Sequence, residues 1–252
     1  MRCALIGSGS AGNALLVTGG DTRLLVDCGY SIKAFEARAS QLAFEPASLD
    51  AILVTHEHAD HLGGVLPLAR KYALPVYWSR GTSLAASVGP GARPATHEFS
   101  PHASFVIGDI DIQPVAVPHD AREPTQFVFR HGGVQLGLLT DLGSVTPHVL
   151  AAYAACDALI LEFNHDPTLL GESAYPPALK TRVASAYGHL SNAQSRAFLA
   201  QLDTSRLQRL VAAHLSERTN RPALVADCLA HCLPGVVVEI ARQDAVLPWF
   251  EV

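Results

Sequence analysis

The sequence has little of what marks secreted or membrane-spanning proteins. Five cysteines are scattered over 252 residues, an odd number and a poor disulfide framework, so we expect a reducing compartment. No run of apolar residues approaches the about 18 that a membrane span needs, and the amino-terminal region has no signal-peptide pattern. These absences predict a cytoplasmic protein without a membrane partner.

Charged residues are also sparse, at 16% against 49% hydrophobic residues, which predicts a large buried core and argues against disorder. The 18 Lys and Arg against 23 Asp and Glu leave a net charge of −5, so the chain has no basic footprint for nucleic acid or an anionic membrane. This counts against a nuclease without excluding one, because bound divalent cations add positive charge that the formal sum ignores.

Short apolar runs alternate with helical patterns along the whole chain. Strands are expected at residues 3–6, 14–18, 23–27, 51–55, 75–78, 105–117, 125–130, 134–140, 158–163, 207–213 and 236–241. Helices are expected at residues 31–42, 61–72, 147–156, 177–187, 192–202 and 222–231, and a short helix with loops at 79–104. No linker separates the two halves. We therefore predict a single domain over residues 1–252 with a mixed α/β (α+β) fold, two sheets covered by helices.

The segment THEHADHLGG at residues 55–64 joins a buried strand to a helix and carries four candidate metal ligands. His56 and His58 face the same way in extended backbone and can grip one ion together. Asp60 and His61 are redirected where the helix starts and can reach a second ion. Imidazoles and carboxylates converging on one point are the ligands of divalent transition metals.

Five more strand ends carry residues of the same types. They are Asp27, His119, Asp141, Glu162 and His214. One polar residue at a strand end is usually a helix cap or a turn former. Five metal-compatible residues at such ends indicate one centre, because ligands of mixed α/β sheets gather beyond strand ends. A merely solvated polar loop at residues 55–64 is the alternative.

This pattern resembles the metallo-β-lactamase superfamily, whose fold is an αββα sandwich with a two-metal site along one edge. The resemblance implies that His56, His58 and His119 hold the first metal ion. It implies that Asp60, His61 and His214 hold the second, that Asp141 bridges both, and that Asp27 orients the histidine-rich loop without being a ligand. The expected cofactor is two divalent ions, zinc first, with manganese and iron as alternatives.

Other motifs narrow the branch. TDLG at residues 140–143 resembles the phosphodiesterase and thioesterase branches, and AHLSER at 213–218 resembles the final motif of tRNase Z. GSGSAGNA at 7–14, EFNHD at 162–166 and GHLSN at 188–192 are most similar to the WalJ-type (YycJ-like) exonuclease branch, over nearly the whole chain. Phe163 and Ala11 depart from this pattern, since small polar residues are expected there.

The chemistry implied is hydrolysis with metal-bound hydroxide as the nucleophile. Asp60 is expected to orient the water, and His189, supported by Glu162, to protonate the leaving alkoxide. A plain polar residue beside a helix cap is the other interpretation of His189. Two groups of residues are candidates for the substrate. Ser8, Ser10 and Asn13 lie in a glycine-rich turn that is either a phosphate cradle or an ordinary hairpin, and Asn164, His165 and Ser216 are expected to line the cleft.

Three functions remain open at this point. The first is a phosphodiesterase that cleaves nucleic acid from an end, with nucleic acid as substrate and partner. The second is a hydrolase of a small thioester, lactone or cyclic phosphodiester on the same metals. The third is a non-catalytic metal carrier, which the complete ligand set disfavours. No stable protein partner or oligomeric state can be inferred.

Overall fold

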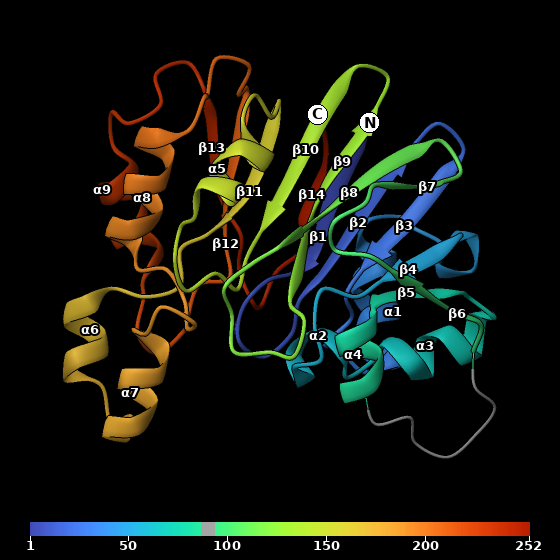
Figure 1. Cartoon of the computed structure of the whole chain (residues 1–252), viewed down its shortest axis with the longest axis horizontal. Coiled ribbons are helices and arrows are strands. Elements are labelled where there is room, and N and C mark those ends of the chain that lie inside the picture. Colours follow the sequence, from blue (N-terminus) through green and yellow to red (C-terminus); the bar gives the residue numbers. More distant parts are fainter. Residues whose placement is uncertain (87–93) are drawn as a thin grey trace.

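The computed structural model describes residues 1–86 and 94–252, which form two mixed sheets packed face to face with helices on the outer faces (Figure 1). In spatial order, the first sheet contains β14 (Leu247–Glu251), β1 (Arg2–Gly7), β2 (Ala14–Gly19), β3 (Thr22–Val26), β4 (Ala51–Leu53), β5 (Val76–Ser79) and β6 (Thr96–Phe99). The second contains β13 (Val237–Ile240), β12 (Arg209–Ala213), β11 (Ala158–Glu162), β10 (Val134–Leu139), β9 (Thr125–His131), β8 (Ile110–Ala116) and β7 (Phe105–Ile107). This is the predicted αββα sandwich.

The helices divide between the two sheets. On the first sheet lie α1 (Ile32–Gln41), α2 (Ala59–Leu62), α3 (Val65–Tyr72) and α4 (Arg80–Ala85), with a short 3₁₀ turn at Pro46–Ser48 (Figure 1). On the second lie α5 (Pro147–Tyr153), α8 (Asn192–Gln201) and α9 (Pro222–Leu229). The remaining two, α6 (Pro167–Glu172) and α7 (Pro177–Val183), project as a lobe at the end of the second sheet (Figure 1). No described helix is long and apolar enough to cross a membrane.

Strand β11 shows why the sequences of the interior strands are continuously apolar. Its side chains alternate between two cores: Ala158 and Ile160 pack between the sheets, while Leu159 and Leu161 pack under the helices of the second sheet. A strand covered on both faces needs apolar residues at every position. At about 25 cal/mol per Å² of apolar surface buried, these layers supply the main driving force for folding.

The predicted helix over residues 61–72 is wrong as a single element, because α2 ends at Leu62 and α3 starts at Val65. Gly63 and Gly64 lie between them. A Cβ at Gly64 would lie 1.9 Å from the carbonyl oxygen of Tyr30, so the chain passes that loop at a distance only glycine allows.

The predicted strand over residues 105–117 is a hairpin of β7 and β8 that turns at Gly108, whose φ is +54°. Strands β6 and β14 and helix α6 were not predicted. β14 is held mainly by its antiparallel pairing with β1, at the far end of the sequence, which local patterning does not reveal. Part of the predicted 79–104 region, residues 87–93, lies outside the described residues. The other predicted elements overlap observed ones.

Parallel pairing explains where the site lies. β3 pairs in parallel with β4, and β11 pairs in parallel with both β10 and β12. The carboxyl ends of neighbouring parallel strands meet at one edge of a sheet, so residues that follow these strands converge. His61 of α2 contacts Asp27 after β3 of the first sheet and Asp141 after β10 of the second.

Candidate metal centre

The residues that follow the strands meet in overlapping groups whose ligand atoms lie within 4.8 Å of one another. The groups are His56, His58 and His119; Asp60, His61 and His214; His56, His61 and Asp141; and Asp141, Glu162, His189 and His214. The first two are the triads expected for two separate ions. Asp141 shares groups with both triads, as a bridging residue would.

Three of the strand-end residues have left-handed backbone. The φ angles are 58° at Asp27 and 55° at His214, directly after β3 and β12, and 53° at Asp141, which follows β10 after Thr140. A non-glycine residue in this region costs about 1 kcal/mol or more and persists where the surroundings hold it. Here the turned backbone stops each strand and aims a ligand-type side chain at the edge between the sheets.

In the first triad, neighbouring groups hold the Nδ1 atoms of His119 and His56. His119 Nδ1 lies 3.0 Å from the carbonyl oxygen of Gly188, and His56 Nδ1 lies 3.0 Å from the Thr55 hydroxyl. His119 Nε2 then faces His58 Nδ1 at 3.3 Å. A carbonyl acceptor on Nδ1 fixes the tautomer whose Nε2 lone pair is free for a metal.

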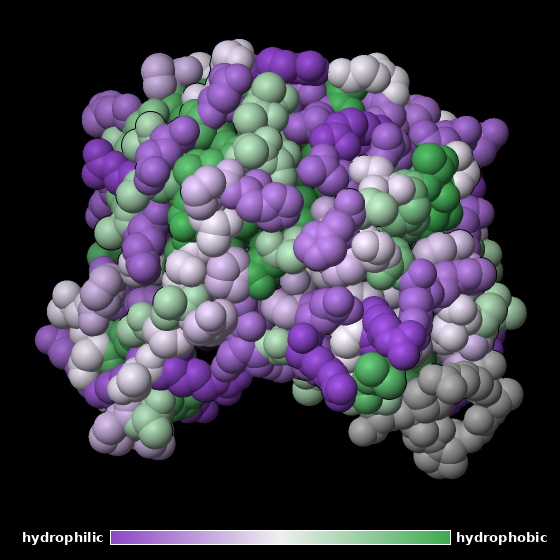
Figure 2. All heavy atoms as spheres, in the orientation of Figure 1, coloured by the Kyte–Doolittle hydropathy of each residue, from purple (hydrophilic) through white to green (hydrophobic). Residues whose placement is uncertain are grey.

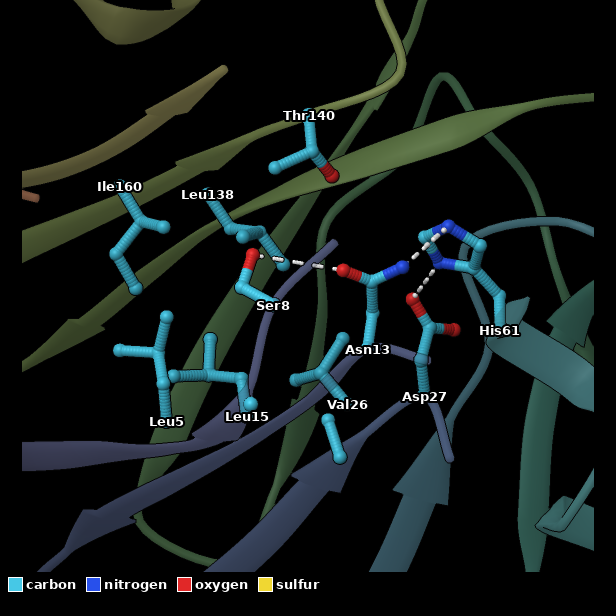
Figure 3. A pocket seen from close by; sticks show the side chains of 12 residues that line it. Leu5, Ser8, Asn13, Leu15, Val26, Asp27, His61, Leu138, Thr140 and Ile160 are labelled. Carbon is cyan, nitrogen blue, oxygen red and sulfur yellow. Dashed lines mark hydrogen bonds and ion pairs between the residues drawn. The ribbon is translucent and has the colours of Figure 1, made fainter. Parts of the chain in front are cut away.

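Asp27 contacts His61 of the second triad and the loop that carries the histidines. Its Oδ2 lies 2.8 Å from His61 Nδ1 (Figure 3). The same oxygen accepts the Thr55 hydroxyl at 2.7 Å, and Oδ1 accepts the Thr55 N–H at 2.8 Å. His61 Nε2 faces Asp141 Oδ2 at 3.3 Å and Asp60 Oδ2 at 3.4 Å. Asp60 Oδ2 also lies 3.6 Å from His214 Nε2.

The carboxylates of the centre stabilise positive charge on the histidines of the second triad. Burial opposes protonation of His214, but Asp141, Asp60 and Glu162 outweigh it and raise its pKa to about 10. Burial likewise opposes protonation of His61, yet Asp141 and Asp27 raise its pKa well above the usual value. Burial opposes ionisation of Asp60 and Asp141, but the neighbouring histidines hold both pKa values low. Cationic charge is therefore favoured in the second triad.

Three atoms of the centre are buried without a hydrogen-bond partner among the described residues. They are His56 Nε2, Asp141 Oδ2 and His214 Nε2. An unsatisfied buried polar atom costs about 1–3 kcal/mol. All three belong to the convergent groups, and imidazole nitrogens with carboxylate oxygens are the donor set that zinc and related divalent ions take. The residues present therefore fit a divalent metal.

Glu162 contacts both His189 and His214. Its Oε1 is 2.9 Å from His189 Nδ1 and 2.8 Å from His214 Nδ1, and its oxygens accept the N–H groups of Asp141, Leu142 and Leu190. Burial would raise the pKa of this carboxyl, but the two histidines lower it to about 2. His189 is partly exposed, so its ring combines a fixed orientation with access to solvent.

In the glycine-rich turn, Ser8 and Asn13 contact residues of the centre, whereas Ser10 faces solvent. The Ser8 hydroxyl accepts the His214 N–H at 2.8 Å, and Asn13 Nδ2 lies 3.1 Å from His61 Nε2 and 3.3 Å from Asp60 Oδ2. Both side chains are buried (Figure 3). Ser10 is exposed and lines a cavity beside His189.

Of the other three residues predicted to contact the substrate, two line this cavity and one does not. Asn164 and Ser216 line the cavity beside His189. His165 is buried and is not among the lining residues, and its Nδ1 has no hydrogen-bond partner in the described part of the chain.

Sequence reasoning missed Asp120 and Arg182. Asp120 Oδ1 lies 3.4 Å from His119 Nε2 and 3.9 Å from His58 Nε2, and its other oxygen is ion-paired with Arg182 of α7. The position of Asp120 next to His119 was a signal that the sequence offered. Nothing in the sequence marks Arg182, which the fold brings from a distant helix.

Comparison with known proteins agrees with this geometry. The family model for the Beta-lactamase superfamily domain matches residues 22–215. The chain belongs to this superfamily. It is 34% identical to the Bacillus anthracis protein Exodeoxyribonuclease YycJ, over 98% of this chain and 97% of the relative. It is also 34% identical to Exodeoxyribonuclease WalJ of Streptococcus pneumoniae serotype 2, over 96% of this chain and 93% of the relative.

Solved structures show the same fold. The metallo-β-lactamase fold protein YhfI from Bacillus subtilis superposes with a TM-score of 0.75 at 20% identity, covering 97% of this chain and 98% of that one. Zn²⁺-bound PqqB from Methylobacterium extorquens superposes with a TM-score of 0.76 at 16% identity, covering both chains fully. The predicted fold and the resemblance to the WalJ-type branch are confirmed, and the chain is a hydrolase of this fold.

Proposed function

We propose that this protein is a metal-dependent exonuclease that hydrolyses phosphodiester bonds of nucleic acid, DNA in particular. The observation that carries the proposal is the convergence of two ligand triads on Asp141, next to the His189–Glu162 pair. The names of the two full-length relatives, both exodeoxyribonucleases, support DNA as the substrate.

We propose two divalent ions as cofactor, zinc first and manganese or iron as alternatives. His56, His58 and His119 would hold one ion, Asp60, His61 and His214 the other, and Asp141 both. When bound, the pair would supply an activated water at neutral pH and neutralise charge on the phosphate. The buried unpartnered atoms of His56, Asp141 and His214 support this assignment.

The protein's own groups have separate tasks in this proposal. Asp60, held by His61, His214 and Asn13, orients the attacking water and accepts its proton. His189 donates a proton to the leaving oxygen. Because Glu162 engages Nδ1 of His189, the other ring nitrogen, Nε2, is left for that transfer.

We further propose a cytoplasmic location and one domain over the whole chain. All five cysteines are unpaired, which fits a reducing compartment. Contacts between β14 and β1 tie the end of the described chain to its beginning, which fits one folding unit.

Hydrolysis of a small thioester, lactone or cyclic phosphodiester is the second candidate. The net charge of −5 favours it, because few Lys and Arg contacts to phosphates imply weak binding of a long polyanion. A metal carrier without catalysis is disfavoured, since His189 and Glu162 add proton-transfer groups beside the triads.

A substrate panel tests the proposal. Protein reconstituted with Zn²⁺, Mn²⁺ or Fe²⁺ is given end-labelled DNA and RNA, single-stranded and duplex, beside a chromogenic phosphodiester and a glutathione thioester. We expect progressive shortening of nucleic acid from an end, best at low salt and without base specificity. Brisk thioester cleavage with intact nucleic acid would overturn the proposal and favour the second candidate.

A further inference from the structure

A cavity of about 170 Å³ opens beside the metal centre, between it and the α6–α7 lobe. The face drawn in Figure 2 is hollowed between this lobe, at the lower left, and the rest of the molecule. The residues that line the cavity include His189 and Asp120 of the centre. They also include Tyr175, Leu179 and Arg182 of the lobe. A group bound here would lie next to the residues assigned to the reaction.

Tyr175 gives the cavity an aromatic wall. The side chain is half-buried, and the guanidinium of Arg218 lies 5.8 Å from its ring centroid. Pro176 follows it directly and restricts the backbone before α7. An aromatic ring held in this way is a surface on which a planar group can stack at little cost in conformational entropy.

Other lining residues are polar, and we call them the polar wall. They are Ser10, Asn164, Ser216 and Thr219. Thr219 is fully buried, yet its Oγ1 has no hydrogen-bond partner among the described residues. Such an atom lacks the hydrogen bond that buried hydroxyls normally make. The cavity therefore combines an aromatic ring with polar side chains, one of which has a buried hydroxyl without a partner among the described residues.

We propose that this cavity binds the terminal nucleotide of the strand being cleaved, with its base stacked on Tyr175 and its sugar against the polar wall. This inference rests on the proposed exonuclease function and adds the site that receives the chain end. At about 170 Å³ the cavity is smaller than the roughly 300–1,000 Å³ of pockets that enclose drug-sized ligands, so it would hold the base and leave the sugar and phosphate only partly enclosed. Stacking also explains recognition without base specificity, because every base has a π-face.

Arg182 fits the same assignment. Its guanidinium is ion-paired with Asp120, which lies beside His58 and His119, so it sits where the cavity meets the metal centre. The scissile phosphate links the terminal nucleotide to the next one, and a guanidinium at this point can pair with its oxygens. The lobe thus contributes both an aromatic and a cationic contact to one bound nucleotide.

The test compares three variants on two substrates. Tyr175→Ala removes the ring, Tyr175→Phe keeps it, and Tyr187→Ala removes a tyrosine that is 62% exposed and does not line the cavity. One oligonucleotide has ordinary ends, and the other has an abasic residue at both ends. The initial rate of release of the first nucleotide is measured over a range of substrate concentrations, together with metal content.

We expect Tyr175→Ala to lower kcat/KM on the ordinary oligonucleotide by about 5- to 150-fold, the range of one base–aromatic stack, and to leave the abasic oligonucleotide and metal content unchanged. Tyr175→Phe and Tyr187→Ala should match the wild type on both. Equal loss on both substrates, or no loss on either, would overturn the inference while leaving the exonuclease proposal intact. A wild-type protein that shortens neither oligonucleotide would instead overturn the proposed function.

Discussion

Oε1 of Glu162 lies 2.9 Å from Nδ1 of His189. The same oxygen lies 2.8 Å from Nδ1 of His214, so one buried carboxylate holds both a residue assigned to proton transfer and a residue assigned to a metal. The carboxylate is itself fixed by backbone N–H groups, including that of Asp141. Metal binding and proton transfer therefore depend on the same supporting residue, Glu162, but use different side chains. Separate mutations can test the two roles.

His189→Ala should keep the metals and lose turnover. The proposed role is proton donation, and loss of a general acid lowers the rate by about 10²–10⁴-fold. His58→Ala, in the first triad, should lose metal and activity together. Metal content by plasma mass spectrometry is compared with kcat on end-labelled DNA, because its leaving alkoxide needs the proton. Equal metal loss in the two variants would make His189 a ligand and the assignment wrong.

Asp141→Ala should lower the occupancy of both ions, because its carboxylate belongs to groups that include His56 of one triad and His61 and His214 of the other. Asp157→Ala is the matched control: Asp157 is also a buried, ion-paired aspartate, but it pairs with Arg206 at the opposite end of the second sheet. The control should lower the thermal midpoint and retain metal. Full metal content in Asp141→Ala would refute the bridging role.

Asp27→Asn should weaken metal binding by about 10–100-fold, the usual effect of losing a residue that orients a ligand. Asparagine tolerates the left-handed backbone at this position, where φ is 58°, so the change removes charge rather than backbone fit. Asp50→Asn is the control, since Asp50 accepts the Arg23 N–H at the other end of β3. Competition with a chromogenic chelator measures both affinities, and equal values for the two variants would count against the orienting role.

Gly64→Ala should destabilise the protein by about 1–3 kcal/mol, because the added Cβ would meet the Tyr30 carbonyl oxygen at 1.9 Å in the loop that carries the histidines. Gly171→Ala, in α6, meets no atom within 4 Å and should raise stability by about 0.5–1 kcal/mol through better helix propensity. Urea unfolding of the two variants checks the contrast. A Gly64→Ala protein as stable as the wild type would show that the helix break is not required.

The sequence predicted that His119, Asp141 and His214 gather beyond strand ends, whereas their division into two triads came from the family resemblance. The gathering follows a simple regularity: β8, β10 and β12 run in the same direction, so their carboxyl ends lie at one edge of the sheet. The two sheets followed from alternating apolar runs. What local patterning could not show was the break at Gly63–Gly64, since it depends on how closely the Tyr30 loop approaches.

The substrate side of the site was the harder part. Tyr175 and Arg182 stand in helical or irregular segments with no distinctive spacing, and only the fold brings them against His189 and Asp120. For Ser8 and Asn13, the sequence suggested a substrate role as one of two interpretations. Their glycine-rich turn allowed a phosphate cradle or a hairpin, and the structure places both side chains in hydrogen bonds to the metal loops.

The central claim is that nucleic-acid cleavage depends on a pair of ions, and a metal titration tests it most directly. Metal-free protein is titrated with Zn²⁺ or Mn²⁺ while nucleotide release from end-labelled DNA and bound metal are measured in the same samples. The account predicts that activity rises with occupancy and reaches its plateau at two ions per chain. A plateau at one ion, or intact DNA at full occupancy, would contradict it.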